Sequence, residues 1–124
     1  MLRSLGRGKF GEVVLAREKA SDYIVALKRM GRKELADGNF TEQVKREIVI
    51  QSSVSHPHLL KLFGYFWDSQ AVYLILEFAP RGELYGLLRE AGSFSEQQVA
   101  VVLRQVCAAL AHLHARDIIH RDLK

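Results

Sequence analysis

Three glycines near the start of the chain constrain its fold more than any other feature. They are Gly6, Gly8 and Gly11, and the segment Gly-Arg-Gly-Lys-Phe-Gly that contains them fits the pattern G-x-G-x-x-G. Taken alone, this pattern occurs in dinucleotide-binding folds, in other nucleotide-binding folds and in accidental turns. The residues that follow decide between them, because a dinucleotide fold requires a helix there and an acidic residue about 20 positions further on.

The residues after Gly11 are typical of a strand. Glu12-Val-Val-Leu-Ala-Arg has no helical period, and Ala26 stands where a dinucleotide fold would have its acidic residue. We therefore set the dinucleotide interpretation aside. A glycine loop between two strands lets backbone N–H groups approach phosphate oxygens, because no side chains intervene. The alternative is a glycine-rich hairpin that binds no ligand.

The chain is mostly extended before residue 80. Short apolar runs separated by polar turns predict strands; the runs are 13–15, 23–27, 59–66 and 71–77, with turns at 19–22 and 67–70. One stretch among them changes to a helical period. Thr41 to Val54 predicts an amphipathic helix with Thr41 as its N-cap.

Residues 80–82 predict a linker, and the composition beyond it is helical. Ser95 and Gln98 have the spacing of a capping box. Apolar residues at helical spacing then predict a helix over about 96–115; they are Val99, Val102, Leu103, Val106, Leu110 and Leu113. Residues 117–119 are strand-like. Strands before residue 80, helices after it and one inserted helix predict an α+β fold.

Composition excludes several classes of protein. The chain has 124 residues, 48% of them hydrophobic, so it can bury a core. Its net charge is only +4, and no basic stripe is interleaved with aromatic residues, so the sequence does not predict a nucleic-acid partner. The longest uncharged apolar run, 71–76, is too short to span a bilayer, and the first eight residues contain no apolar core of signal-peptide length, so we expect no membrane span and no export signal.

Cys107 is the only cysteine in the sequence. One cysteine allows neither an intrachain disulfide nor a four-thiolate zinc site, and its apolar neighbours predict a small buried thiol. The histidines at 56 and 58, and those at 112 and 114, form two pairs spaced two residues apart, a spacing that does not share a helix face. We therefore expect no zinc, and an intracellular, reducing environment.

A lysine ends the apolar run 25–27. Val25-Ala26-Leu27-Lys28 matches the pattern V-A-I-K, in which the lysine holds the α- and β-phosphates of a nucleotide. Such a lysine needs a carboxylate to orient it, and Glu47, at the border of the apolar face of the predicted helix, is the candidate. The alternatives are a strand lysine that faces water and an ordinary surface glutamate.

The last residues form the segment His120-Arg121-Asp122-Leu123-Lys124. H-R-D-L opens a catalytic loop in which the aspartate accepts the proton of an attacking hydroxyl. Lys124 would then meet the transferring phosphate, where its charge offsets the negative charge on the equatorial oxygens.

With these motifs in order, the whole chain resembles the protein kinase superfamily, and more narrowly the Aurora family of serine/threonine kinases. The segments that carry the narrower resemblance are Gly8-Lys-Phe-Gly11, Leu15-Ala-Arg-Glu-Lys19, Arg46-Glu-Ile-Val-Ile-Gln51, His56-Pro57, Tyr73-Leu-Ile-Leu-Glu77 and Ala79-Pro-Arg-Gly-Glu-Leu-Tyr85. The resemblance implies a protein-kinase-like fold. Residues 1–79 would form the antiparallel-sheet small lobe, with a hinge at 77–79, and residues 80–124 the first helices of the α-rich large lobe.

The resemblance also implies roles for particular residues. Leu76 would be the gatekeeper, the hinge backbone would hold adenine, and Asp122, Lys124 and Lys28 would be catalytic. At Glu83, in the segment Arg-Gly-Glu-Leu-Tyr, the chain resembles the chromosomal-passenger branch of the family. A carboxylate at this position suits a substrate arginine upstream of the target Ser or Thr. The residues implied to surround ATP are Leu5, Gly6, Gly8, Lys9, Gly11, Val13, Ala26, Lys28, Glu47, Leu76, Glu77, Ala79 and Glu83.

Protein kinases use ATP with Mg²⁺, whose ligands come from the pattern H-R-D-L-x-x-x-N and a later D-F-G. Neither ligand is present in the 124 residues, so we expect the metal ligands to lie C-terminal to Lys124 and this chain alone to be inactive. The resemblance further implies a mitotic kinase of the nucleus, chromosomes and spindle, with an activator protein docked on the small lobe and no membrane partner. The alternative is a non-catalytic module, from a truncated kinase product, that binds a nucleotide or a protein partner.

Overall fold

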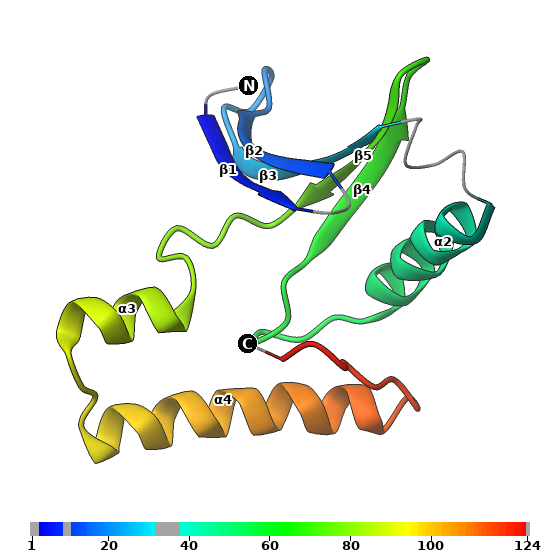
Figure 1. The fold of residues 1–124 in the computed structure, drawn as a ribbon. Helices are drawn as coiled ribbons and strands as arrows, with labels where there is room; N and C mark the ends of the chain where they lie inside the picture. Colours follow the sequence, from blue (N-terminus) through cyan, green and yellow to red (C-terminus); the bar gives the residue numbers. More distant parts are fainter. Residues whose placement is uncertain (1–2, 9–10, 32–37, 124) are drawn as a thin grey trace. The chain divides into compact units, whose positions relative to one another are not determined.

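The computed structural model describes residues 3–8, 11–31 and 38–123 (Figure 1). Its strands are β1 (Arg3–Gly8), β2 (Gly11–Arg17), β3 (Ile24–Gly31), β4 (Leu62–Trp67) and β5 (Ala71–Leu76). Its helices are α2 (Gly38–Ser53), α3 (Leu84–Ala91) and α4 (Glu96–His114). Strands therefore come first and helices last, with α2 inserted among the strands, which confirms the predicted α+β class.

The chain divides into two compact units. The first consists of Met1–Ser53 and Leu60–Phe78, and the second of Val54–Leu59 and Ala79–Lys124. The sequence placed the boundary after residue 79 and kept 54–59 with the strands. Residues 54–59 lie between α2 and β4 in the sequence, and no sequence pattern indicated that they group with the later helices.

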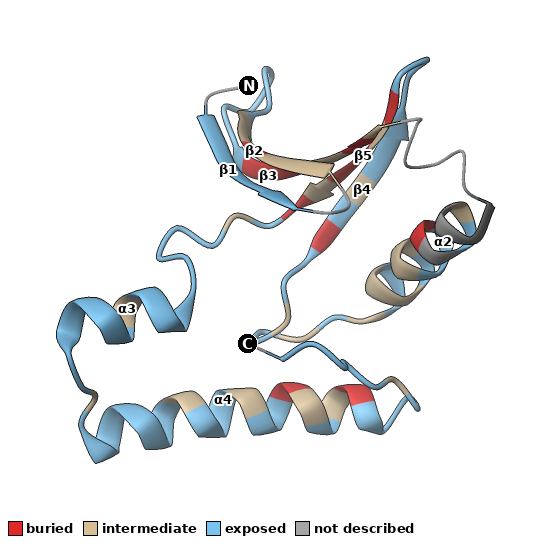
Figure 2. Cartoon of the chain, viewed as in Figure 1, coloured by how far each residue is buried: buried red, intermediate tan, exposed pale blue. Residues whose placement is uncertain are grey.

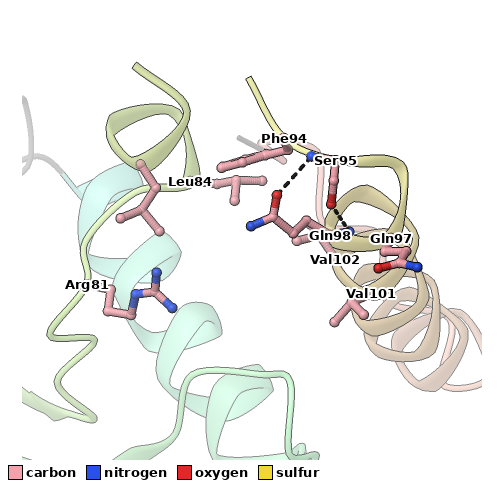
Figure 3. Close-up of a pocket in the computed structure, with 9 residues that line it drawn as sticks. Arg81, Leu84, Phe94, Ser95, Gln97, Gln98, Val101 and Val102 are labelled. Atoms are coloured by element: carbon pink, nitrogen blue, oxygen red, sulfur yellow. Dashed lines mark hydrogen bonds between the residues drawn. The ribbon is translucent and has the colours of Figure 1, made fainter. Parts of the chain in front are cut away.

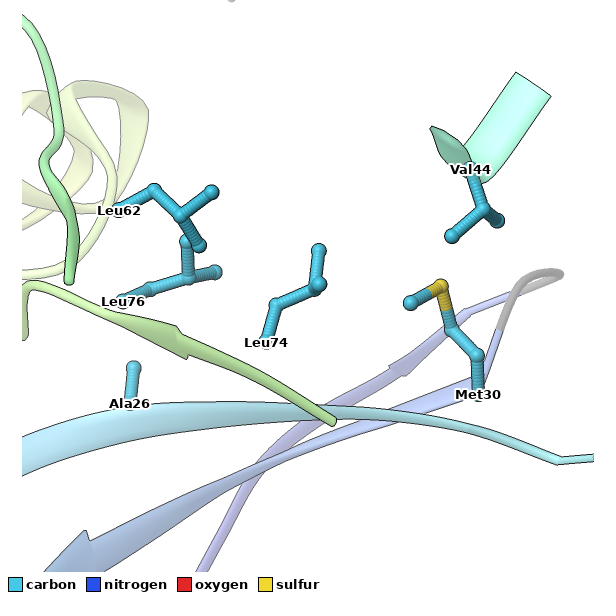
Figure 4. Close-up of a cluster of buried hydrophobic side chains, with 6 residues drawn as sticks. All are labelled: Ala26, Met30, Val44, Leu62, Leu74 and Leu76. Carbon is cyan, nitrogen blue, oxygen red and sulfur yellow. The ribbon is translucent and has the colours of Figure 1, made fainter. Parts of the chain in front are cut away.

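All five strands of the first unit form one antiparallel sheet in the order β1-β2-β3-β5-β4. Side chains alternate between the faces of each strand, so every second residue points toward α2. Figure 4 shows the resulting core, in which side chains from β3, β4 and β5 meet Val44 of α2. Its buried members are Ala26, Met30, Val44, Leu62, Leu74 and Leu76.

The opposite face of the sheet holds a second apolar cluster, made of Val14, Leu27, Ala71 and Tyr73. Beside it lies a hollow of about 610 Å³, lined by apolar and aromatic side chains that include Tyr23, Phe63, Phe66 and Ile75. Buried residues lie mainly in the strands, and the loops and much of the helical surface are exposed (Figure 2). The first unit therefore has a sheet that is apolar on both faces.

The predicted N-cap of α2 is wrong. The helix begins at Gly38, so Thr41 lies within its first turn. Val44 is buried in the core and Ile48 packs against it. Packing of an apolar face stabilises a helix more than the residues at its end do, and can extend the helix beyond a capping signal.

Helix α4 begins where the sequence predicted. The Ser95 hydroxyl accepts the backbone N–H of Gln98, and the Gln98 side chain accepts the backbone N–H of Ser95 (Figure 3). This reciprocal capping box satisfies two N–H groups that the helix itself leaves unpaired. These residues, together with Arg81, Leu84 and Phe94, line a hollow of about 380 Å³. Figure 3 shows the side chains that line it.

Two predictions for the last part of the chain are wrong. Cys107 is exposed, because the buried stripe of α4 runs through Ala109 and Leu113 and the cysteine lies off that face. Residues 117–119 form no strand in the part of the chain that the structure describes, and Asp117 has a left-handed φ of 57°. An extended run needs a partner strand to pair its backbone groups.

None of the described helices is long and apolar enough to cross a membrane.

Candidate nucleotide-binding site

The three glycines lie where the hairpin of β1 and β2 turns, and the fold itself requires one of them. Gly11 has a φ of 123°, and a Cβ atom at this position would lie 1.9 Å from the backbone oxygen of Arg29. A side chain there would therefore collide with β3. Gly11 allows β2 to start in close contact with the neighbouring strand.

Gly6 and Gly8 are different, since the described structure leaves the space around them open. A Cβ atom built on either would meet no described atom within 4 Å. Neither φ is positive, so the backbone does not require glycine there. Leu5, next to them, is exposed, and the β1–β2 register shifts between Ser4 and Gly6. The bare backbone of Gly6 and Gly8 is therefore available for close approach by a ligand.

The sheet face toward α2 brings several predicted site residues together. Val13 is the antiparallel partner of Lys28, and Ala26 is the partner of Leu76. Partners in an antiparallel ladder point to the same side of the sheet. Ala26 and Leu76 are buried in the core, and Val13 packs against it. This face combines an apolar surface with Lys28, which the sequence predicted to hold the nucleotide phosphates.

Lys28 forms an ion pair with Glu47 across this face. The Lys28 Nζ atom donates a hydrogen bond to Glu47 Oε1 at 2.8 Å, which joins β3 to α2. The side chains are 23% and 41% exposed, so the pair is partly shielded from water. The predicted pairing is thus present. Glu47 takes the position that the sequence proposed, because Val44 and Ile48 turn the same part of α2 toward the sheet.

Glu77, at the end of β5, is fixed at two points by the residue that precedes β4. Its backbone N–H donates to the carbonyl oxygen of Lys61 at 2.8 Å, and its carboxylate accepts the backbone N–H of Lys61 at 3.1 Å. The segment expected to hold adenine therefore begins at an anchored residue. No sequence pattern pointed to Lys61, because the contact arises from sheet pairing between distant segments.

The predicted residues Ala79 and Glu83 belong to the second unit. Ala79 is exposed and accepts the Gly82 N–H in the turn that follows it. Glu83 is the N-cap residue of α3, and its side chain makes no capping hydrogen bond. Its carboxylate is therefore exposed at a helix N-terminus, where the helix dipole favours negative charge.

Asp122 is exposed in the second unit, and its backbone N–H donates to His120 Nδ1 at 3.3 Å. The residue between them, Arg121, has a φ of 64°. A left-handed backbone costs a non-glycine residue roughly 1–2 kcal/mol and is found more often at functional sites than elsewhere.

Lys9 and Lys124, the remaining predicted site residues, lie outside the described residues. Within the described ranges, no cluster of three or more His, Cys, Asp or Glu side chains is arranged to hold a metal ion.

One residue that holds the glycine hairpin together, Glu12, was not predicted from the sequence. Glu12 accepts a hydrogen bond from the Ser4 hydroxyl at 3.0 Å, and its other oxygen lies 3.8 Å from Arg7 Nη2. Both contacts cross from β2 to β1, so they hold the two strands around the glycines. Strand alternation could have suggested this role, because Arg7 and Glu12 are antiparallel partners.

Comparison with known proteins agrees with this geometry. The protein kinase domain model matches residues 1–124. Aurora kinase B of Mus musculus is 48% identical over 98% of this chain and 35% of its own length. The serine/threonine-protein kinase Aurora-2 of Arabidopsis thaliana is 49% identical over 98% of this chain and 43% of its own length. For the Aurora kinase of Schizosaccharomyces pombe the figures are 49%, 98% and 34%.

The chain thus spans less than half the length of these curated relatives. The glycine hairpin, the lysine–glutamate pair and the H-R-D segment all fall within the part that is shared. The expected similarity to the Aurora kinases is confirmed, and the chain belongs to the protein kinase domain family.

Proposed function

We propose that the protein transfers the γ-phosphate of ATP to serine or threonine hydroxyls of other proteins. The observation that carries this proposal is the partly shielded pair of Lys28 and Glu47, on the same sheet face as Val13, Ala26 and Leu76. The apolar face of the sheet can pack against the adenine ring. The Lys28 ammonium, held in place by Glu47, can bind the α- and β-phosphates. The two features together favour a nucleoside triphosphate.

The glycine hairpin supports the same proposal. Gly6 and Gly8 expose their backbone without a steric need for glycine, whereas Gly11 is required by contact with β3. Backbone N–H groups in such a segment can donate to phosphate oxygens. Glu12 holds the hairpin through Ser4 and Arg7, which limits the reorganisation needed when a nucleotide binds.

Asp122 would act as the acceptor of the substrate hydroxyl proton. The hydroxyl oxygen then attacks the γ-phosphorus, the bond to the β–γ bridging oxygen breaks, and ADP leaves. Magnesium supplies charge neutralisation at the phosphates in this family. Within the described ranges, no cluster of three or more His, Cys, Asp or Glu side chains is arranged to hold this metal, so the described residues would bind the nucleotide and accept the hydroxyl proton.

Glu83 supports a preference for basic substrates. Its exposed carboxylate is not used to cap α3, so it can accept the guanidinium of a substrate arginine. We propose that this arginine lies upstream of the target Ser or Thr, as the family resemblance implies.

Phosphotransfer by the full-length protein tests this function. With Mg²⁺-ATP and an arginine-containing serine peptide, the wild type should transfer phosphate and the Asp122→Asn variant should lose at least about a hundredfold in kcat, as expected for removal of a general base. Glu83→Gln should raise KM for the arginine peptide and leave KM for an arginine-free peptide unchanged. Equal turnover by wild type and Asp122→Asn would contradict the proposal. ATP binding without any turnover in either protein would favour the alternative, a nucleotide- or partner-binding module.

We also propose that an activator protein of the chromosomal-passenger type docks on the small lobe. Tyr65 and Trp67 support this, because they stack at 6.2 Å on the edge strand β4 and are 51% and 69% exposed. Exposed aromatic pairs are common in protein interfaces. Replacing both by alanine should abolish stimulation by the activator and leave basal phosphotransfer unchanged. Alanine at the exposed Tyr85 of α3 is the control.

The Aurora resemblance leads us to propose a role in cell division, at nuclear chromosomes and the spindle. A fluorescent fusion of the full-length protein, followed through mitosis, tests this location. Concentration on chromosomes or spindle is expected, and a uniform distribution throughout division would contradict it.

A further inference from the structure

Two histidines pack against each other inside the second unit. The ring centroids of His56 and His112 lie 5.0 Å apart, with the ring planes at 45°. His112 belongs to the last turn of α4, and His56 belongs to Val54–Leu59, the segment that groups with the helices. Their contact therefore joins this segment to α4. Neither residue has a role in the proposed phosphotransfer.

The hydrogen bonding of His56 defines its neutral form. Its Nδ1 atom accepts the backbone N–H of His58 at 3.1 Å, so Nδ1 carries no proton. In the neutral ring the proton is then on Nε2. The His58 N–H thus holds the His56 ring in a fixed orientation within the turn 56–58.

His112 is in a setting that opposes positive charge. Its Nε2 atom is buried and has no hydrogen-bond partner among the described atoms. Arg116 donates from its guanidinium to the His112 carbonyl oxygen at 2.9 Å, which holds a positive charge close by. Burial, then Arg116, then His56 lower the pKa of His112. A buried nitrogen without an acceptor cannot compensate the loss of water when the ring becomes charged.

We infer that His56 and His112 form a pH-sensitive latch that holds residues 54–59 on α4 while the His112 ring is neutral and releases them when this ring takes up a proton. The two groups that act on the His112 ring, His56 from the segment and Arg116 from the end of α4, both oppose its positive charge. His58 contacts His56, with ring centroids 5.5 Å apart, and would be displaced with it.

The direction of the pH dependence follows from linkage. The packed state lowers the pKa of His112, so the packed state binds fewer protons than the released state. The contact is therefore strongest above the ordinary histidine pKa of about 6.5 and weakens as the pH falls below it. At low pH the opening equilibrium rises about tenfold for each unit that separates the two pKa values.

The position of the segment gives the latch a consequence for the rest of the molecule. Val54 directly follows α2, which ends at Ser53 and carries Glu47. Release of 54–59 would therefore remove the contact with His112 that restrains the segment directly after α2. The inference does not depend on the proposed function, because the latch can be measured without nucleotide.

Histidine NMR on the full-length protein between about pH 5 and 8 tests the latch in the wild type. The His112 ring signal should titrate with a midpoint below about 6.5, and the amide signal of His58 should shift with the same midpoint. A His112 midpoint at or above the ordinary value would overturn the inference, and so would a His58 amide that does not follow it. This measurement needs no variant, so it stands even if a substitution prevents folding.

Hydrogen exchange with matched variants supplies the second readout. After correction for the intrinsic pH dependence of exchange, residues 54–59 of the wild type should exchange faster at pH 5 than at pH 8, by about tenfold for each unit of pKa lowering. His112→Phe keeps a ring and removes the proton site, so this rise should disappear. His114→Phe, at an exposed position in the same helix turn, should retain it. A rise that persists in His112→Phe would overturn the inference.

Discussion

Lys28 and Glu47 lie 2.8 Å apart, from Nζ to Oε1, and this contact ties β3 to α2. A second pair in the same unit, Lys45 and Glu42, has the same separation. Its side chains are 65% and 73% exposed, against 23% and 41% for the first pair. Exposed pairs contribute little because water screens them. The two pairs therefore provide a matched comparison between a functional contact and a surface one.

Replacing Glu47 by Gln should weaken ATP binding, because Lys28 loses the carboxylate that orients it. A hydrogen bond to a charged group is worth roughly 1.5–3 kcal/mol, which corresponds to about a ten- to hundredfold rise in KM for ATP. Glu42→Gln is the control and should leave KM unchanged. Steady-state kinetics on the full-length protein measures both. Equal effects of the two substitutions would show that the partly shielded pair has no special role.

Alanine substitutions should separate the two kinds of glycine in the hairpin. Gly11→Ala forces a Cβ atom to within 1.9 Å of the Arg29 carbonyl oxygen at a positive φ, and should lower the free energy of unfolding by at least about 1–3 kcal/mol. Gly8→Ala has open space and should change stability by less than about 0.5 kcal/mol. It should instead weaken ATP binding, since a methyl group would stand where phosphate oxygens approach. Chemical denaturation and ATP titration distinguish these results, and a destabilised Gly8→Ala protein would contradict the assignment.

Much of the fold could be predicted, because local signals and packing agree. The capping box at Ser95 and Gln98 identified the start of α4, and alternating apolar runs identified β2 to β5. Where packing outweighed local signals, prediction failed. Helix α2 starts before Thr41, and Cys107 is exposed because only one stripe of α4 is buried. The grouping of 54–59 with the helices depends on contacts between distant segments.

The candidate site was predictable to the extent that motif spacing fixes it. The glycines, Lys28 and Glu47 were identified from patterns, and the structure brings the last two into contact. The supporting contacts of Glu12 and of Lys61 with Glu77 were not foreseen, because they depend on strand register. The contact between His56 and His112 was also missed, because it joins a turn and a helix that lie far apart in the sequence.

The turn between β4 and β5 should become less stable in acid. Backbone N–H groups of Gln70 and Ala71 lower the pKa of Asp68, with a smaller contribution from the Tyr73 hydroxyl. A lowered pKa in the folded state gives stability that is present above the ordinary value of about 3.9 and is lost as the pH falls through the lower folded value.

Asp68→Asn should therefore be less stable than the wild type at neutral pH, and the difference should shrink as the pH falls below about 4. Tyr73→Phe removes the smaller contribution and should have a smaller effect. Thermal unfolding across this pH range gives the answer. A difference between wild type and Asp68→Asn that stays constant with pH would contradict the role of the Asp68 charge.

The stability of the first unit should depend strongly on Leu74, a residue of β5 whose side chain is completely buried in the core that β5 shares with α2. Leu74→Ala should lower the free energy of unfolding by about 2–5 kcal/mol, through lost burial and the cavity that remains. Val49→Ala on the exposed side of α2 should change it by less than about 0.5 kcal/mol. Urea denaturation measures both values. A loss of less than about 1 kcal/mol for Leu74→Ala would contradict the core described here.

The role of Lys28 can be tested by finding which lysine lies beside the phosphates of bound ATP. An ATP analogue with a reactive acyl group on its terminal phosphate acylates a lysine amine that lies beside the bound phosphates, and peptide mass spectrometry identifies the site. In the full-length protein, Lys28 should be acylated, and excess ATP should suppress the reaction. Lys45, whose partner is the exposed Glu42, should show no ATP-sensitive labelling. Absence of labelling at Lys28, or labelling that excess ATP does not reduce, would contradict the account.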